Sequence, residues 1–425
     1  MTTTETHDVV VIGGGPAGST AAALLAREGA DVVVLEKERF PREHVGESLL
    51  PFCYRLFEDL GVVDQLATTF ARKPGVRFVD ASGERSTTWC FDHVIRDETY
   101  LSFQVIRTEF DTILLDNAAR LGADVRQETR VVDVDIDESP DGVTVRAAGP
   151  DGVEREIAAR FLVDASGRDA FVGTRKRWRT PREELDRTAL WSHWEGVELT
   201  HGIEEGLSVI VYLGGDWKGW IWLFPLGPDR VTAGLVAENS FFREESKRLR
   251  EAGSEDWQMD VLTERFGQSF VGDILAPGRM LIPIQVAGNY SYEVKNHFGP
   301  NYCMVGDARG FIDPIFSSGI FLSIKSAFLV ADPIRRRLAG STDLTGLEPA
   351  YDLLAGAAHF VPRMIRLFYA PNAVTWADIG AETDLHRRAE SAMALGHFML
   401  SGDFFENYRK YDEFLQLIED PAKFR

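Results

Sequence analysis

The stretch DVVVIGGGPAG, from Asp8 to Gly18, decides the fold that this sequence predicts. Its run of Val and Ile is typical of a buried parallel strand, and the alanine- and leucine-rich segment after it predicts a helix. The turn between them has the pattern G-x-G-x-x-G, formed by Gly13, Gly15 and Gly18 around Pro16 and Ala17. Gly13 allows the tight turn, Gly15 lets the backbone approach a pyrophosphate, and Gly18 lets helix and strand pack closely. The segment therefore predicts a dinucleotide site.

A second strand and an acidic residue strengthen this prediction. The apolar run 31–35 predicts a strand that ends at Glu36, 18 residues after Gly18, and Lys37 follows. A carboxylate at this place accepts hydrogen bonds from ribose hydroxyls and repels an additional 2′-phosphate. The predicted fold class is α/β with a Rossmann-type nucleotide-binding domain. The alternative is a glycine-rich turn that binds no ligand.

The length and the apolar pattern limit the other possibilities. The chain has 425 residues, so we expect two intimately packed domains or one large, elaborated domain. No apolar run approaches the roughly 18 residues that cross a bilayer, and the first residues lack a basic region followed by an apolar segment. We expect a cytoplasmic protein without integral membrane association.

Charge and cysteine content argue against two further classes of function. The formal net charge of −20 would repel a nucleic-acid backbone, so we expect no nucleic-acid partner. The three cysteines, Cys53, Cys90 and Cys303, are odd in number and have no C-x-x-C spacing. This pattern predicts neither a disulfide framework nor a metal site.

The order of the segments resembles that of the FAD-dependent monooxygenase and halogenase superfamily, from residue 8 to about residue 335. The segment 161–168 (FLVDASGR) looks like a second flavin fingerprint, with Asp164 at the end of a strand and Gly167 shortly after it. The segment 302–308 (YCMVGDA), with Gly306 and Asp307, looks like the third, whose aspartate holds the ribityl chain. The resemblance therefore implies FAD as the cofactor.

Three further segments resemble cofactor contacts of the same superfamily. Arg107, at the end of FQVIR, matches an arginine that contacts the cofactor, and Val131 lies where the adenine-contacting strand begins. Glu47 and Ser48, in the segment HVGES, resemble a loop that crosses the isoalloxazine. No second G-x-G-x-x-G follows a strand, so no nicotinamide domain is evident. A separate flavin reductase is the expected source of reduced FAD (FADH2).

The resemblance also implies an architecture of the GR2 type, like that of para-hydroxybenzoate hydroxylase. An FAD-binding domain is expected at residues 1–80, 100–180 and 280–338. A mixed-sheet substrate domain is expected at 81–99 and 181–279, and a helical C-terminal region at 339–425.

The segment 220–225 (WIWLFP) resembles the W-x-W-x-[IF]-P mark of flavin-dependent halogenases, with Phe224 where isoleucine is usual. In a strand, Trp220 and Trp222 point to the same face, so they present one apolar wall. The wall is expected to separate flavin from substrate, so that only a small oxidant crosses. The alternative is an aromatic-rich strand in the core.

Lys73, in the segment RKPGVRF, resembles the halogenase lysine that stands between the two chambers. Its ammonium could donate a hydrogen bond to hypohalous acid, or its neutral amine could accept the halogen as a haloamine. The second route needs a free amine, which partial burial beside the indoles would favour. The sequence leaves both routes open.

The segment 311–320 (FIDPIFSSGI) resembles the part of halogenases that binds halide and flavin. Free N–H groups of Ser318 and Gly319 at a helix start are expected to hold chloride, and Pro314, Gly319 and Ile320 to contact the cofactor. The alternative is a capped helix that packs on the flavin. Tryptophan halogenases carry a glutamate where Phe316 stands, so its absence argues against an indole substrate. A phenol or pyrrole needs less help to attack electrophilic chlorine.

Together these motifs predict an FAD-dependent halogenase in which a flavin hydroperoxide and chloride give hypochlorous acid. The predicted catalytic region contains Lys73, Trp220, Trp222 and Phe316. The expected substrate is a pyrrolyl group on an acyl or peptidyl carrier protein of antibiotic biosynthesis, which would meet a basic face at 335–337, Arg363 and Arg366. The alternatives are halogenation of a free phenol, aromatic hydroxylation, reduction of a prenyl chain, and redox sensing without turnover.

Overall fold

The computed structural model describes residues 5–136, 142–182, 186–213, 219–288, 291–311, 314–341, 346–369, 396–397 and 399–419.

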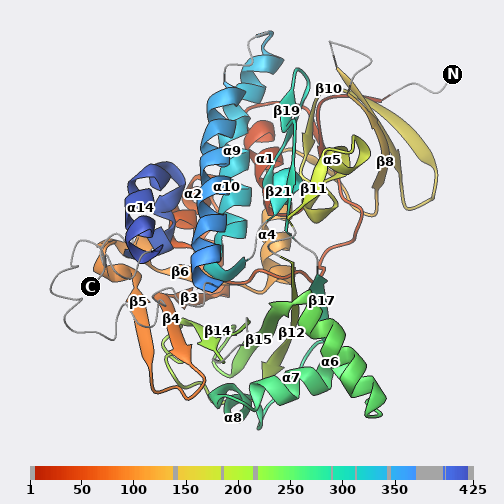
Figure 1. The fold of residues 1–425 in the computed structure, drawn as a ribbon. Coiled ribbons are helices and arrows are strands. Elements are labelled where there is room, and N and C mark those ends of the chain that lie inside the picture. The colour runs from red at the N-terminus through yellow and green to blue at the C-terminus, as the bar shows by residue number, and fades with distance from the viewer. Residues whose placement is uncertain are drawn as a thin grey trace.

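The strand–turn–helix unit predicted from residues 8–18 opens the fold (Figure 1). Strand β1 (Glu5–Ile12) leads into helix α1 (Pro16–Arg27) and pairs in parallel with β2 (Val32–Leu35) and β10 (Glu154–Asp164). Strand β20 (Tyr302–Met304) pairs in parallel with β10. The strands of the three fingerprints are therefore neighbours, and their carboxyl ends share one edge of the sheet. The predicted Rossmann-type α/β fold is confirmed.

The remaining strands extend this first sheet. Its order is β19–β20–β10–β1–β2–β7, and the antiparallel strands β8 and β9 attach to β10. A small sheet, β11–β18–β21, lies beside it with helix α5. The bounds are β19 (Phe298–Gly299), β7 (Asp124–Arg126), β8 (Arg130–Asp135), β9 (Val143–Ala148), β11 (Arg179–Pro181), β18 (Tyr292–Val294), β21 (Gly310–Phe311) and α5 (Phe171–Arg175).

Two cores cover the two faces of the first sheet because side chains alternate along a strand. Val9 and Val11 pack into the main core with α1, α4 (Arg107–Arg120) and α9 (Ser318–Leu338). Val10 and Ile12 pack on the opposite face with β8 and β9. Helices α1, α4 and α9 therefore cover one face, and their N-termini reach the edge where the fingerprint strands end.

A second sheet lies below the first in Figure 1, with the order β16–β12–β15–β14–β13–β4–β5 and with β17 paired to β12. One face contributes Trp220, Trp222 and Phe224 to the main core, and the other contributes Ile221 and Leu223 to a core with α6, α7 and α8. The predicted alternation of strand β14 is confirmed. The bounds are β16 (Arg279–Met280), β12 (Arg187–Glu195), β15 (Arg230–Glu238), β14 (Trp220–Pro225), β13 (Ser208–Tyr212), β4 (Gly75–Asp80), β5 (Ser86–Cys90), β17 (Gln285–Gly288), α6 (Asn239–Glu251), α7 (Trp257–Phe266) and α8 (Phe270–Leu275).

Two segments that the sequence assigned to the FAD-binding domain pair in the second sheet instead. Residues 75–80 form β4, which pairs in parallel with β13, and residues 285–288 form β17, which pairs with β12. Both strands are short (GVRFVD and QVAG), and their patterns fit either sheet. Long-range pairing decides their place, and a single sequence does not display it.

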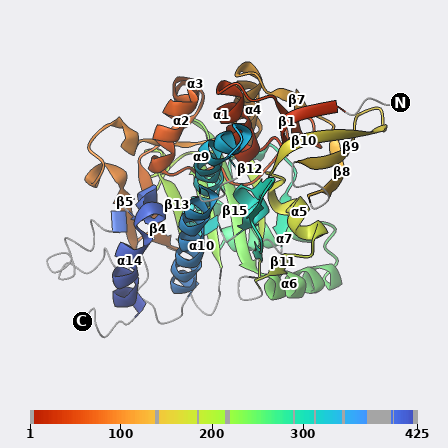
Figure 2. The same ribbon diagram turned by 90° about the horizontal axis from the view of Figure 1, so that it is seen from above.

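Helices form the rest of the described chain. Between β2 and α4 the chain forms two short helices, α2 (Tyr54–Leu60) and α3 (Val63–Thr69). It also forms a two-stranded unit of β3 (Ala71–Lys73) and β6 (Ser102–Gln104). α10 (Leu347–Tyr369) lies along α9, and α14 (Phe404–Glu419) packs on α10 at the side of the molecule opposite β8 and β9 (Figure 2). Short 3-10 turns occur at Pro51–Cys53, Phe91–His93, Glu98–Tyr100, Gly167–Asp169, Gly306–Arg309 and Pro314–Phe316, and a π-helical turn at Met399–Asp403. None of the described helices combines the length and apolar character needed to cross a membrane.

Candidate active site

A cavity of about 710 Å3 lies where the carboxyl edge of the first sheet meets the second sheet. It brings together most of the residues predicted for the site, although they are dispersed along the chain. The wall includes Gly13, Gly15, Pro16, Ala17, Glu36, Lys37, Glu47, Ser48, Arg107, Val131, Gly167, Asp307, Gly319, Ile320, Trp220 and Trp222.

The glycine turn has the geometry that its sequence predicts. Gly13 has φ +96°, which an L side chain rarely adopts, and a Cβ on Gly18 would lie 1.9 Å from the Gly13 carbonyl oxygen. Gly18 is thus a packing residue and is not on the cavity wall. Glu36 accepts hydrogen bonds from the N–H groups of Gly14 (2.7 Å) and Glu38 (2.8 Å). A carboxylate has further acceptor sites, so Glu36 can still bind a ribose hydroxyl.

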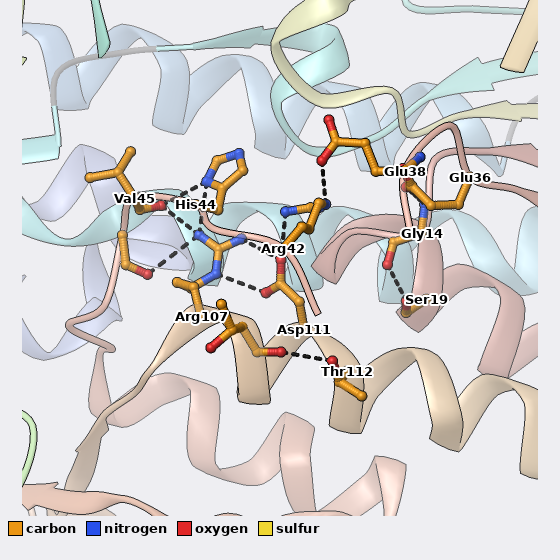
Figure 3. Close-up of polar contacts among 12 residues, drawn as sticks. Gly14, Ser19, Glu36, Glu38, Arg42, His44, Val45, Arg107, Asp111 and Thr112 are labelled. Atoms are coloured by element: carbon orange, nitrogen blue, oxygen red, sulfur yellow. Dashed lines mark hydrogen bonds and ion pairs between the residues drawn. The ribbon is translucent and has the colours of Figure 1, made fainter. Parts of the chain in front are cut away.

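Arg107 organises the loop that leads from Phe40 to Ser48 (Figure 3). Its guanidinium makes two 2.8 Å hydrogen bonds to Asp111, one turn further along α4, and donates to the Val45 carbonyl. Arg42 pairs with the same aspartate at 3.3 Å. Arg107 is therefore bound largely by the protein, and it positions the cavity wall while forming part of it.

Two positive groups, Arg42 and Arg107, border the place where a pyrophosphate would lie. Arg42 lines the cavity, and its guanidinium lies next to Gly15. His44 lies against Arg107, and burial, with the neighbouring guanidinium, lowers the His44 pKa to about 3, so this imidazole is neutral. Arg42 was not predicted from the sequence, although a basic residue shortly before the segment HVGES is a signal that could have identified it.

The second and third fingerprints place some of their predicted residues on the cavity wall and others behind it. Gly167 and Asp307 line the cavity, whereas Asp164 does not. The Asp164 carboxylate accepts from the N–H groups of Ser166 (3.0 Å) and Val172 (2.8 Å) and is fully buried. It holds the turn after β10 from behind the wall. Gly306 has φ +58° and also lies behind the wall.

Burial raises the pKa of Asp307 to about 6, although Arg168, Arg107 and Arg309 oppose this effect.

Two further predicted residues, Lys37 and Val131, lie on the cavity wall. Lys37 forms an ion pair with Asp169, and both residues line the cavity. Val131, on β8, lies on the same wall.

The N-terminus of α9 reaches the cavity without a side-chain cap. Ser317 precedes the helix in the left-handed region (φ 55°), and its side chain makes no capping hydrogen bond. Ser317, Gly319 and Ile320 line the cavity, and Ser318 is buried beside them. N–H groups at such an end attract an anion.

Phe316, predicted for the same segment, is not on the cavity wall. Phe316 is buried in the main core. Only the backbone of Pro314 is described, in the turn Pro314–Phe316. The short turn directs Phe316 into the apolar interior, and a phenyl ring is most stable there.

Trp220 and Trp222 form the predicted indole wall. Both are buried, both line the cavity, and their ring centroids lie 5.7 Å apart. Phe224 continues the row, 6.4 Å from Trp222. The Trp222 indole N–H donates to the Thr232 hydroxyl at 3.2 Å, which fixes the ring orientation.

Lys73 is buried, with only 2% of its surface exposed. Its amine donates to the Ser48 hydroxyl (2.8 Å) and to the Leu49 carbonyl (3.0 Å) and lies over the Phe91 ring. Among the described residues, no carboxylate forms an ion pair with it. Burial lowers the Lys73 pKa to about 7, so the amine is partly neutral near pH 7. Lys73 does not itself line the cavity, but Ser48 does.

His193 and Glu47 form a buried pair that the sequence analysis missed. Nε2 of His193, on β12, is hydrogen-bonded to the Glu47 carboxylate, and both side chains are almost inaccessible to solvent. Glu47 lines the cavity. The pair therefore connects the loop of the first sheet to the second sheet. A histidine in the mixed strand β12 (RTALWSHWE) gave no sign of this partner.

The predicted absence of a metal site stays a prediction. Side chains of metal-ligand type gather in two groups among the described residues: Cys90, Asp92 and His93, and Glu5, His7 and Asp124. Neither group lines the cavity.

The cavity fits FAD by its chemistry. Its wall combines a tight glycine turn and an uncapped helix start for a pyrophosphate, an acid after β2 for a ribose, and an aromatic wall for a planar ring. Its volume lies within the range of cofactor sites.

Comparison with known proteins agrees with this chemistry. Residues 6–352 match the FAD binding domain family. A tryptophan 2-halogenase of Chondromyces crocatus is 34% identical over 370 residues, which are 86% of this chain and 68% of that protein. The chain belongs to the flavin-dependent halogenases.

Solved halogenase structures share the architecture of this halogenase. A triple mutant of the flavin-dependent brominase Bmp2 is 25% identical with a TM-score of 0.80, and the match covers 98% of this chain and 100% of that one. The myxobacterial chondrochloren halogenase CndH is 27% identical with a TM-score of 0.76, and the match covers 97% of both chains. FAD is therefore the cofactor of the cavity.

Proposed function

We propose that this halogenase chlorinates an electron-rich aromatic ring, with a pyrrolyl group tethered to a carrier protein as the first candidate substrate. A separate flavin reductase supplies reduced FAD. The observation that carries this proposal is the buried amine of Lys73, which is joined to the cofactor cavity through Ser48 and has no carboxylate partner among the described residues.

Reduced FAD, together with oxygen, supplies the oxidant that turns a halide ion into hypohalous acid. The chain's own residues define the place of this event. The uncapped N–H groups at Ser318 and Gly319 bind the chloride at the cavity wall. The indoles of Trp220 and Trp222 fill the side of the second sheet, so an organic substrate cannot enter the cofactor cavity there.

The hydrogen bonds of Lys73 favour the haloamine route. A neutral amine has two N–H donors, and the described part of the chain offers it two acceptors, Ser48 and the Leu49 carbonyl. The lone pair of that amine is then free. An ammonium would have a third N–H group without a hydrogen-bond acceptor in a buried, uncharged place.

The proposed transfer has two balanced steps. The amine lone pair attacks the chlorine of hypochlorous acid, an N–Cl bond forms as the Cl–O bond breaks, and the amine proton and the hydroxide leave as water. The aromatic carbon then attacks the chlorine of the haloamine. The ring loses its proton, and Lys73 returns as the amine.

The choice of substrate rests on Phe316 and on the surface of α9. A phenylalanine in this place supplies no acid, so a ring that attacks without assistance is favoured. The proposed carrier-docking face has less free charge than the sequence predicts, because Arg335 and Arg336 both pair with Asp332. Arg366 is exposed. If a carrier protein docks on this face, reversing the charge of Arg336 and Arg363 should slow the halogenation of a tethered substrate and leave that of a free substrate unchanged.

Mass spectrometry tests the proposal. The halogenase is incubated with FAD, a flavin reductase and oxygen, with chloride or bromide, and with three substrates: a carrier-bound pyrrole, a free phenol and tryptophan. Tryptophan and bromide are included because similar proteins are named for them. Chlorine on the tethered pyrrole, lost in Lys73→Met, supports the proposal. Hydroxylated product instead of halogenated product would contradict it and favour an aromatic hydroxylase.

A further inference from the structure

Ser48 connects the cofactor cavity to the amine of Lys73. It lines the cavity, and its hydroxyl oxygen accepts a hydrogen bond from the Lys73 amine at 2.8 Å. The main chain of Ser48 forms a bridge with Gln104, next to β3, the strand that carries Lys73. Ser48 is therefore held between the cofactor cavity and the Lys73 amine.

Two further buried side chains, Ser208 and Gln104, continue the hydrogen-bond network from the Ser48 hydroxyl. The Ser208 hydroxyl, on β13, lies 2.8 Å from it. The Gln104 amide donates to the Ser208 hydroxyl (2.7 Å) and to the Gly206 carbonyl (3.3 Å). A carbonyl only accepts, so the Gly206 contact sets the orientation of the amide. Lys73, Ser48, Ser208 and Gln104 are each at most 5% exposed.

Two contacts of this network have a fixed donor. Lys73 donates to Ser48 and Gln104 donates to Ser208, whereas either hydroxyl can donate in the contact between Ser48 and Ser208. When Ser208 donates, Ser48 accepts from both Lys73 and Ser208, which uses both lone pairs of its oxygen. The Ser48 O–H is then left without an acceptor among the described protein groups, at the cavity wall.

We propose that Ser48, supported by Ser208 and Gln104, is a positioning residue that aims the Lys73 amine and adjusts its charge for halogen transfer. The inference rests on the proposed function. The network contains only neutral groups, so it orients the amine without making it a permanent cation. Burial lowers the Lys73 pKa to about 7, and the hydrogen bond to Ser48 opposes this effect in part, because it stabilises the ammonium more than the neutral amine.

Removing the Ser48 hydroxyl should affect Lys73 in a defined direction. An ammonium needs acceptors more than a neutral amine does, so the loss of one acceptor makes the Lys73 pKa fall, by about one pH unit. Ser208→Ala should lower it less, because Lys73 keeps its direct contact. Ser48→Thr keeps the hydroxyl and should restore the pKa.

The first test measures the charge of Lys73 without turnover. Protein with oxidised FAD bound and 13C-labelled lysine side chains is titrated by NMR, and Lys73→Met identifies the Lys73 signal. Ser102→Ala is the matched control, because Ser102 is equally buried and faces Lys73 in the β3–β6 pair but is outside the network. An unchanged Lys73 pKa in Ser48→Ala, or an equal change in Ser102→Ala, would overturn the proposal.

The second test measures halogenated product per reduced FAD consumed across pH. Ser48→Ala should lose about tenfold of its product per reduced FAD consumed, the effect of one buried hydrogen bond. Expressing the product per reduced FAD separates this loss from any change in the rate of FAD reoxidation. The acid limb of its pH profile should move to lower pH, and that of Ser208→Ala should move partway. Normal product from Ser48→Ala would contradict the positioning role. If the wild type itself makes no halogenated product, the proposed function fails, and the NMR titration still decides the network.

Discussion

The indole of Trp222 lies over Gly234, its cross-strand partner on β15. A Cβ placed on Gly234 would lie 2.3 Å from the six-membered ring of Trp222 and 2.7 Å from Cβ of Trp191. Only glycine leaves space for the ring in this row of the sheet. The indole wall therefore depends on a residue of the neighbouring strand as well as on its own sequence.

Gly234→Ala should displace Trp222 and open the wall. Overpacking of this kind costs about 1–3 kcal/mol of folding free energy, measured by denaturant unfolding. The variant should also release more free hypohalous acid per reduced FAD, because the partition no longer fits. Gly227→Ala, in the β14–β15 turn, is the control, because its Cβ would make only an ordinary 3.5 Å contact with Arg230. Wild-type stability in Gly234→Ala would show that Trp222 is not confined there.

The burial of Lys73 should make stability depend on pH. Its folded pKa of about 7 lies below its unfolded value, so the unfolded chain binds more protons between pH 7 and about 10.4, and the stability of the wild type rises with pH in this window. Below pH 7 the full cost of burying the charge remains. Compared with Lys73→Met, the wild type should gain about 2–3 kcal/mol between pH 7 and pH 9. Parallel stability curves for the two proteins would show that Lys73 is not titrating near neutral pH.

The Glu47–His193 pair should couple the two sheets. In a double-mutant cycle of Glu47→Ala and His193→Ala, measured by unfolding, the interaction should contribute about 1.5–3 kcal/mol, the range for a buried hydrogen bond to a charged group. The exposed Arg175–Asp133 pair is the reference, expected below about 1 kcal/mol. Additive losses for the buried pair would mean that the loop and the second sheet are held together by other contacts.

Arg107→Lys should weaken FAD binding by about 10- to 100-fold, measured by quenching of flavin fluorescence. A lysine cannot make the two parallel bonds to Asp111 and still reach Val45, so the loop before Ser48 loses its support. Arg126→Lys, on β7, removes a similar arginine that does not line the cavity and should leave the affinity unchanged. Equal affinity for all three proteins would exclude this role for Arg107.

Local motifs predicted the part of the site that depends on short-range geometry. The glycine turn with Glu36 and the alternation of Trp220 and Trp222 follow from strand and turn geometry, and the structure has them where the sequence predicts. The contributions of Asp164 and Phe316 differ from expectation, because a motif identifies a residue but not the direction of its side chain.

Contacts between distant segments were not predictable. Ser208 is 160 residues from Ser48, and His193 is 146 residues from Glu47, and no local motif marks either partner. Sheet pairing brings them together, as it does for β4 and β17 in the second sheet. A single sequence gives no direct sign of such pairing.

Lys73→Met tests whether the Lys73 amine transfers the halogen, with halogenated product and consumption of reduced FAD measured in the same reaction. Met is similar in length and apolar, so the buried site should remain filled. The account predicts that halogenated product falls by at least about 100-fold while reduced FAD is reoxidised at the wild-type rate and hypohalous acid escapes to a scavenger in solution. Halogenation of the substrate by Lys73→Met at the wild-type rate would contradict the account.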